Sequence, residues 1–330
     1  MNKYIGSTFQ LYGVEKYQLL EGKAKGMDIY HVKNGKGLEF CVSLDRNGDL
    51  SSLTYRGVNI SYLSPVGYVN SKYYDANGIG FLKSFTAGFL TTCGLQTVGT
   101  PTNDAGVDCP LHGTIGNTPV ICSSYEVNDE FIMIKTKTID ESMFGIKLIL
   151  NRKIRVSLLE NMFEIDDVVE NTGDKVSPLM ILYHMNLGYP FLDEKLKLII
   201  QSNNVEARNE HALKGINERN KMQTPTDNYE EMCYYHSIKD NGCVMAFNEK
   251  FNFGLKMTFS KNLDSFVEWK MMGVRDYVLG LEPGNSYPDG RSNVRKDGKL
   301  KFISPGEKIN YKIKIKIIDI NEFKTISEEK

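Results

Sequence analysis

The sequence predicts an all-β protein, built as a large antiparallel sandwich. Short runs with alternating apolar and polar residues, separated by turn residues, recur along most of the 330-residue chain. Only residues 204–220 and 228–235 have a helical or irregular pattern. More than a dozen such runs against almost no helix argue for an all-β fold, and the length of the chain favours a sandwich over a barrel. The absence of a repeat at blade-like spacing argues against a propeller.

The alternating pattern begins at Gly37. Residues 37–44 and 50–55 flank turn residues at 45–49, which is typical of a hairpin. Residues 62–119 are rich in glycine, threonine and proline, so we expect loops there that cross one face of a sheet.

Strand patterns return in strength after Asn117. Further runs lie at residues 120–127, 131–138, 147–156, 162–170, 179–183, 196–201, 243–247, 254–259, 266–272, 277–281 and 311–318. We expect a single domain over residues 1–330, with residues 1–36 as an N-terminal extension that packs on it.

Composition and charge argue against several classes of function. The chain has 40 Lys and Arg against 41 Asp and Glu, so no electrostatic argument favours nucleic acid or an anionic membrane. No apolar stretch is long enough to span a bilayer, and the N-terminus lacks the apolar core of a signal peptide. The six cysteines form no C-x-x-C pair or His/Cys cluster, and no glycine-rich nucleotide loop is found. We expect a cytoplasmic protein with free thiols.

Glu282 is the first candidate for chemistry. It follows the apolar run 277–281 and precedes Pro283 and Gly284, so we expect a carboxylate held at a strand end by a stiff turn. Such a carboxylate is well placed to act as a base, although an ordinary solvated loop carboxylate is the alternative.

Two histidines are the next candidates. His112 lies beside Gly113 in the glycine-rich region, and His184 lies where an apolar strand gives way to turn residues. A hydrogen-bonded structural histidine is the alternative for each of them.

The order of three short motifs resembles the galactose mutarotase-like superfamily of aldose 1-epimerases. These motifs are Leu111-His112-Gly113, Tyr183-His184-Met185-Asn186-Leu187-Gly188-Tyr189-Pro190 and Leu281-Glu282-Pro283-Gly284, with weaker similarity at residues 163–173 and 303–307. The resemblance covers the chain from about Gly37 to Ile318 and is closest to a bacterial branch of unassigned substrate. It implies a β-supersandwich whose concave face binds a sugar.

The resemblance also implies a division of catalytic roles. A histidine like His184 protonates the ring oxygen, a histidine like His112 hydrogen-bonds nearby, and a glutamate like Glu282 removes the proton of the anomeric hydroxyl. The residue types suit ring opening, because the C1 hydroxyl must lose a proton while O5 gains one. These roles need an ionised Glu282 and a protonated His184 near neutral pH, and they need no metal, nucleotide or flavin.

Five further residues are candidate substrate contacts. Asn117 and Asn186 carry amides that suit sugar hydroxyls. Trp269 could stack on a pyranose ring, with core packing as the alternative, and Lys270 follows it on the same strand. Arg291 suits a hydroxyl or an acidic substituent, with a solvated loop arginine as the alternative.

We therefore expect an aldose 1-epimerase-like isomerase that acts on a small sugar without a cofactor. A non-catalytic carbohydrate-binding or sugar-sensing protein is a second hypothesis, because fold and function separate readily. A third is a metal-assisted sugar isomerase with His112, His184 and Glu282 as ligands. The identity of the sugar, any phosphate or acidic group on it, and the oligomeric state, including a homodimer, are left open.

Overall fold

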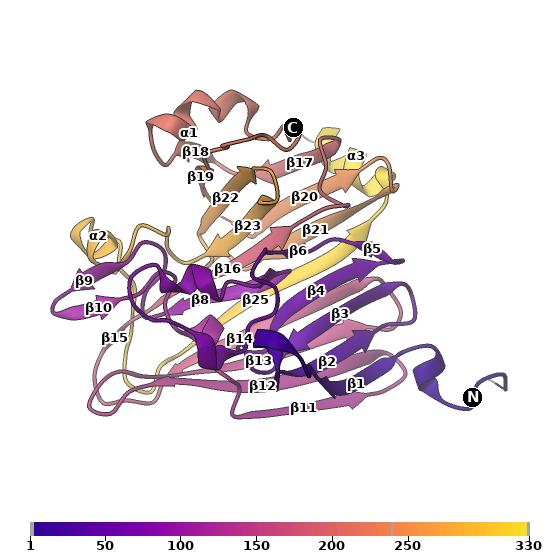
Figure 1. Ribbon diagram of the computed structural model, residues 1–330, viewed down its shortest axis with the longest axis horizontal. Helices are drawn as coiled ribbons and strands as arrows, with labels where there is room; N and C mark the ends of the chain where they lie inside the picture. Colours follow the sequence, from indigo (N-terminus) through magenta and orange to yellow (C-terminus); the bar gives the residue numbers. More distant parts are fainter. Residues whose placement is uncertain (1–2, 239, 329–330) are drawn as a thin grey trace.

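The structure of the protein is a computed structural model that describes residues 3–238 and 240–328. Strands dominate the architecture, and neighbouring strands in the large sheets run antiparallel (Figure 1). The all-β class predicted from the sequence is therefore confirmed.

The largest sheet has eight strands, in the order β11-β12-β13-β14-β25-β21-β20-β17. Along β14 every second side chain is buried, because one face of the sheet packs on the core and the other faces outward. The strands of this sheet are β11 Cys122–Val127, β12 Phe131–Glu141, β13 Lys147–Ser157, β14 Met162–Asn171, β17 Leu196–Gln201, β20 Gly242–Asn248, β21 Phe253–Phe259 and β25 Lys308–Ile318.

A five-stranded sheet in the order β1-β2-β3-β4-β5 stacks on part of the eight-stranded sheet (Figure 1). The two sheets meet through aromatic contacts such as Phe40 with Phe163, whose ring centroids are 5.2 Å apart, and Tyr55 with Phe253, at 4.9 Å. The strands are β1 Gly13–Gln18, β2 Asp28–Lys33, β3 Leu38–Ser43, β4 Asp49–Tyr55 and β5 Val58–Asn59.

A six-stranded sheet in the order β18-β19-β22-β23-β16-β8 carries the candidate site. Every residue of β16 and β23 is buried, so both faces of these two strands are covered. The strands are β8 Leu90–Leu95, β16 Met180–Leu187, β18 Asn204–Ala207, β19 Met232–Ser237, β22 Ser265–Met272 and β23 Tyr277–Gly284.

The remaining elements are short. Three two-stranded sheets pair β6 Tyr62–Leu63 with β7 Ala87–Gly88, β9 Thr102–Asp104 with β10 Val107–Cys109, and β15 Ser177–Pro178 with β24 Phe302–Ile303. The helices are α1 Glu210–Lys214, α2 Arg291–Lys296 and α3 Ile320–Glu328, with 3-10 turns η1 Thr8–Gln10, η2 Gly22–Ala24, η3 Ser71–Tyr73, η4 Gly80–Lys83, η5 Ile115–Asn117 and η6 Ile216–Glu218. Within residues 3–238 and 240–328, no helix has the length and apolar character needed to cross a membrane.

Two of the expected boundaries are wrong. Regular structure begins before Gly37, because β1 and β2 already belong to the five-stranded sheet; β1 is hard to see in the sequence since only its first two residues are buried. Residues 228–235 also end in the strand β19 and not in a helix, because Cys233 and Tyr234 are buried where β19 pairs with β22.

A buried polar cluster joins the sheets behind the candidate site. Arg152 of β13 is 1% exposed and donates to Asp167 in β14 (2.8 and 2.9 Å), to Asp49 in β4 (2.6 Å) and to the Thr92 hydroxyl in β8 (2.8 Å). Tyr183 in β16 donates its hydroxyl to Asp167 at 2.9 Å. The cluster therefore fixes β16, which carries His184, to the opposite sheet.

Candidate active site

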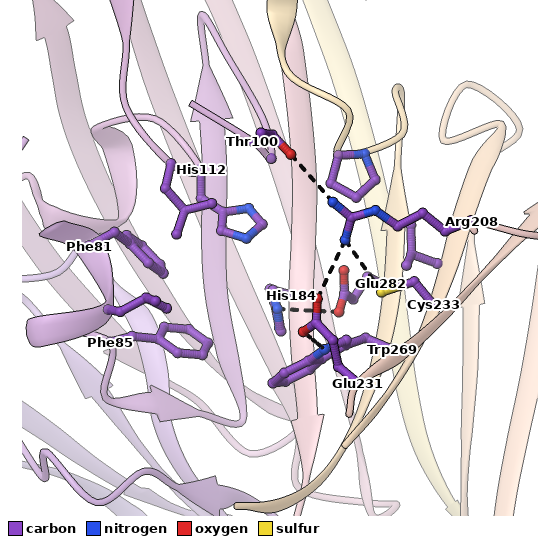
Figure 2. A pocket seen from close by; sticks show the side chains of 15 residues that line it. Phe81, Phe85, Thr100, His112, His184, Arg208, Glu231, Cys233, Trp269 and Glu282 are labelled. Atoms are coloured by element: carbon purple, nitrogen blue, oxygen red, sulfur yellow. Dashed lines mark hydrogen bonds and ion pairs between the residues drawn. The ribbon is translucent and has the colours of Figure 1, made fainter. Parts of the chain in front are cut away.

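A cavity of about 230 Å³ opens between the six-stranded sheet and the loops of residues 62–119 (Figure 2). Aromatic and aliphatic side chains line it together with imidazole, carboxylate and guanidinium groups. The lining residues are Phe81, Leu82, Phe85, Gly99, Thr100, Leu111, His112, His184, Arg208, Glu231, Cys233, Val267, Trp269, Glu282 and Pro288.

Glu282 and His184 meet at the sheet floor of this cavity. His184 Nε2 lies 3.3 Å from Glu282 Oε1, and the two residues come from the adjacent strands β16 and β23. The expectation that a turn holds Glu282 at a strand end is wrong. Glu282 lies inside β23 and pairs with Val267 of β22, so the sheet itself fixes the carboxylate.

The polar atoms of the pair are buried and incompletely hydrogen-bonded. His184 is 5% exposed and Glu282 is 2% exposed. Within the described part of the chain, Glu282 Oε1 and His184 Nδ1 have no hydrogen-bond partner, and the 3.3 Å contact of Oε1 with His184 Nε2 does not form a hydrogen bond. An unsatisfied buried polar atom costs about 1–3 kcal/mol, so such atoms are typically explained by a functional role or a bound molecule.

Burial moves both pKa values toward the uncharged forms. It raises the pKa of Glu282 well above its usual value, and the nearby Glu231 raises it further while Arg208 opposes the rise. Burial lowers the pKa of His184 to about 4. Burial therefore opposes both the ionised glutamate and the imidazolium that the predicted roles need, and those charges stay a prediction.

His112 is positioned by the backbone of the loop region. Its φ of 58° is in the left-handed region, and its amide donates to the Gly99 carbonyl at 3.0 Å. Its ring lies 5.6 Å from the His184 ring in an edge-to-face contact and 5.3 Å from the Phe81 ring. Burial and the neighbouring His184 lower the pKa of His112 to about 3, so both imidazoles are neutral near pH 7.

Trp269 lines the cavity as a candidate contact should. Its ring lies 5.2 Å from the His184 ring, and its indole Nε1–H donates to Glu231 at 2.7 Å (Figure 2). The interaction with Glu231 fixes the plane of the indole, so the ring presents a constant apolar surface to the cavity.

Three polar lining residues were not anticipated from the sequence, namely Thr100, Arg208 and Glu231. Arg208 lies 3.6 Å from Glu231 and donates to the Thr100 hydroxyl at 3.4 Å. The Arg208 amide also donates to the Cys233 carbonyl at 3.0 Å, so the β18–β19 region carries both Arg208 and Glu231 to the cavity. The sequence of this region has an irregular pattern and no motif, and it gave no signal for them.

The two asparagines predicted as substrate contacts do not line the cavity. Asn117 is buried in η5 and accepts a hydrogen bond from the Ser84 hydroxyl at 3.3 Å. Asn186 is buried in β16 and donates to the backbone carbonyl of His184 at 2.9 Å. Both amides support the structure around the cavity.

Lys270 and Arg291 also lie away from the cavity. Lys270 is buried on the opposite face of β22 and donates to the Glu218 carbonyl at 3.4 Å. Arg291 is buried against Asp104, with Nε 2.6 Å from its carboxylate. Neither cation is available to a molecule bound at Glu282.

In residues 3–238 and 240–328, no group of three or more His, Cys, Asp or Glu side chains is arranged to hold a metal ion. The set of His112, His184 and Glu282 therefore does not have the arrangement that the metal-assisted hypothesis requires.

A family model described as "Domain of unknown function (DUF4432)" matches residues 24–317. No curated protein matches the sequence significantly. Among solved structures, the chain is similar to a Klebsiella pneumoniae protein described as a candidate aldose 1-epimerase, with 25% identity and a TM-score of 0.90 over 98% of this chain and 89% of that chain.

Two more distant structures share the fold. A galactose mutarotase-like protein from Clostridium acetobutylicum has 13% identity and a TM-score of 0.68, over 94% of this chain and 100% of that chain. A galactose 1-epimerase from Lactobacillus acidophilus has 14% identity and a TM-score of 0.60, over 93% and 99%. These similarities confirm the galactose mutarotase-like fold that the sequence motifs implied.

Proposed function

Because the chain belongs to the DUF4432 family, whose description names no activity, we propose its function from the site: it is an aldose 1-epimerase-like isomerase that interconverts the anomers of a small sugar. The observation that carries this proposal is the contact of 3.3 Å between His184 and Glu282 at the floor of the cavity. A protein that only binds sugar has no need to bury an acid and a base together.

The pair supplies the two proton transfers of ring opening. The Glu282 carboxylate takes the proton of the C1 hydroxyl, the C1–O5 bond breaks as C1=O forms, and His184 protonates O5. Rotation about C1–C2 then exposes the other face of the aldehyde. Reclosure returns the proton from O5 to His184 and a proton from Glu282 to O1, so the enzyme is regenerated.

The pair needs one proton in total for this cycle. Burial opposes the charged form of both groups, whereas the productive form has the proton on His184 and an ionised Glu282. The two groups lie 3.3 Å apart, so a proton can pass between them. Hydroxyl groups of a bound sugar would donate to Glu282 and favour its ionised form, since a hydrogen bond to a carboxylate lowers its pKa.

The size and walls of the cavity favour a monosaccharide. Its volume of about 230 Å³ is below the ~300–1,000 Å³ of typical drug-sized ligand sites. Phe81, Phe85 and Trp269 present aromatic surfaces that suit the C–H faces of a sugar ring (Figure 2).

The test measures anomerisation by wild type and by Glu282→Gln and His184→Asn variants. Fresh α-anomers of a panel of aldoses are followed by polarimetry, and exchange between anomers at equilibrium is measured by NMR. We expect acceleration by the wild type, and a loss of about 10²–10⁴-fold in each variant with sugar affinity largely retained.

The matched control is Glu126→Gln, which makes the same change on an exposed glutamate of β11 and should retain full activity. Wild type that accelerates no aldose, or a Glu282→Gln variant with the wild-type rate, would contradict the proposal. Sugar binding without acceleration would instead support the carbohydrate-binding alternative.

A further inference from the structure

The proposed base is surrounded by few charged or titratable groups. Burial raises the pKa of Cys233 to about 12 and that of Cys93 well above its usual value, so both thiols are neutral. Among the described residues that line the cavity, Arg208 alone carries a permanent positive charge. The titratable groups near Glu282 are His184 from β16, His112 from the loop region, Cys93 from β8, Cys233 from β19, and Glu231 and Arg208 beside β19 and β18. Of these, Glu231 and Arg208 act on the charge of Glu282.

The Glu231 side chain is held more firmly than the Arg208 side chain. The carboxylate of Glu231 accepts the Trp269 indole N–H at 2.7 Å, a short hydrogen bond that fixes it. The guanidinium of Arg208 has three longer contacts, to Glu231 at 3.6 Å, to the Thr100 hydroxyl at 3.4 Å and to Cys233 Sγ at 3.8 Å. The side chains of Arg208 and Glu231 are 32% and 51% exposed, so this partly solvated pair lies beside the buried Glu282 (Figure 2).

We propose that Arg208 and Glu231 are an opposed charge pair that determines how readily Glu282 acts as the base. Arg208 favours the carboxylate and Glu231 favours the carboxylic acid. This inference rests on the proposed function and extends it to two positioning residues that act through Glu282.

The electrostatic reason is direct. A nearby positive charge stabilises an ionised carboxylate and a nearby negative charge destabilises it. Burial is the largest cause of the raised pKa of Glu282; Glu231 raises it further, and Arg208 lowers it. The indole of Trp269 holds the Glu231 carboxylate in place, whereas the guanidinium of Arg208 has only longer contacts, so the position of that guanidinium sets how strongly it acts on Glu282.

The two limbs of the pH profile report the pair as a unit. Activity needs one proton on the pair, so the acidic limb marks the gain of a second proton and the basic limb marks the loss of the shared proton. Arg208→Gln raises the pKa of Glu282, which moves the basic limb to higher pH and lowers the plateau kcat, because the ionised form becomes rarer. Glu231→Gln lowers the pKa of Glu282, which moves the basic limb to lower pH and raises the plateau kcat.

The experiment compares pH profiles of kcat for wild type, Arg208→Gln, Glu231→Gln and Arg208→Lys. Since both side chains are partly exposed, we expect limb displacements of about one pH unit or less, in opposite directions for the two glutamine variants. Arg208→Lys keeps the charge and should restore most of the wild-type profile. Arg155→Gln, on the exposed face of the distant strand β13, is the matched control and should leave the profile unchanged.

A second readout separates this inference from the proposed function. The carboxyl carbon of Glu282 is followed by NMR in ¹³C-glutamate-labelled protein and assigned by its loss in Glu282→Gln. Wild type without activity on any aldose would refute the proposed function, but the titration midpoint of Glu282 would still test the charge pair. Equal midpoints in wild type, Arg208→Gln and Glu231→Gln, or shifts in the same direction, would overturn the inference.

Discussion

Replacing His184 with glutamine should weaken the dependence of stability on pH. The unfolded chain has a histidine pKa near 6.5, whereas burial lowers the folded value to about 4. Between these values the unfolded state binds the proton and the folded state does not, so stability rises with pH. Stability is therefore lost as pH falls below about 6.5, and the loss is complete near pH 4.

The size of the effect follows from the two pKa values. Their difference, at about 1.4 kcal/mol per pH unit, corresponds to about 3 kcal/mol of unfolding free energy at His184. The side chain is 5% exposed, so solvent screening does not reduce this figure much. Glu282 contributes a slope of opposite sign, because its folded pKa is raised and its contribution is lost as pH rises. The difference between wild type and variant is consequently the quantity to measure.

The assay is urea unfolding at several pH values between 4 and 7, followed by circular dichroism. We expect wild type to lose about 3 kcal/mol more than His184→Gln on acidification from pH 7 to 4. His31→Gln, a partly exposed histidine of β2, is the control for the substitution itself. Parallel stability curves for wild type and His184→Gln would show that the folded protein does not hold His184 as a neutral imidazole.

Two further predictions concern the cavity wall and the polar cluster behind it. Trp269 is the only tryptophan, so a sugar bound in the cavity should change its emission, saturably and equally in wild type and Glu282→Gln; unchanged emission at saturating sugar would place the site elsewhere. Asp167→Asn should reduce the free energy of unfolding by about 3–5 kcal/mol, because it leaves the buried Arg152 guanidinium undercompensated. A loss in urea unfolding below about 1 kcal/mol, the scale of an exposed ion pair, would contradict this.

The fold was predictable because its longest strands carry strong local signals. The alternation in β12, β13 and β14 matches a sheet with one buried face, and the structure has that burial pattern. The element boundaries that were predicted wrongly depend on pairing with other strands. β1 has little apolar alternation of its own and is a strand because β2 pairs with it, while β19 becomes a strand because β22 lies beside it.

Three residues of the candidate site could be predicted because sequence motifs contain them. His112, His184 and Glu282 line one cavity, as expected, although they lie far apart in the sequence. Trp269 and Lys270 could have been separated by strand geometry alone, since neighbouring residues in a strand point to opposite faces. Only one of the two side chains can therefore face the cavity, and Lys270 is the one that points away.

The other outcomes depend on tertiary partners that a single sequence does not reveal. Arg291 does not reach the cavity because it binds Asp104, which lies nearly two hundred residues earlier in the chain. Arg208 lies at the cavity because its backbone amide donates a hydrogen bond to the Cys233 carbonyl. The irregular sequence pattern did not predict this backbone contact. Polar residues of the same types are thus either structural or exposed to the cavity according to their partners, and residue type alone cannot decide between these roles.

The burial of Glu282 and His184 follows from their place within the sheet. β16 and β23 are buried on both faces, and a separated carboxylate and imidazolium at that depth would lose most of their hydration. On the proposed function, sugar hydroxyl groups that donate to Glu282 Oε1, which has no hydrogen-bond partner among the described residues, would stabilise the carboxylate that ring opening requires. Substrate binding and formation of the active base would then be one coupled event, and a sugar lacking the hydroxyl that reaches Glu282 should bind without being turned over.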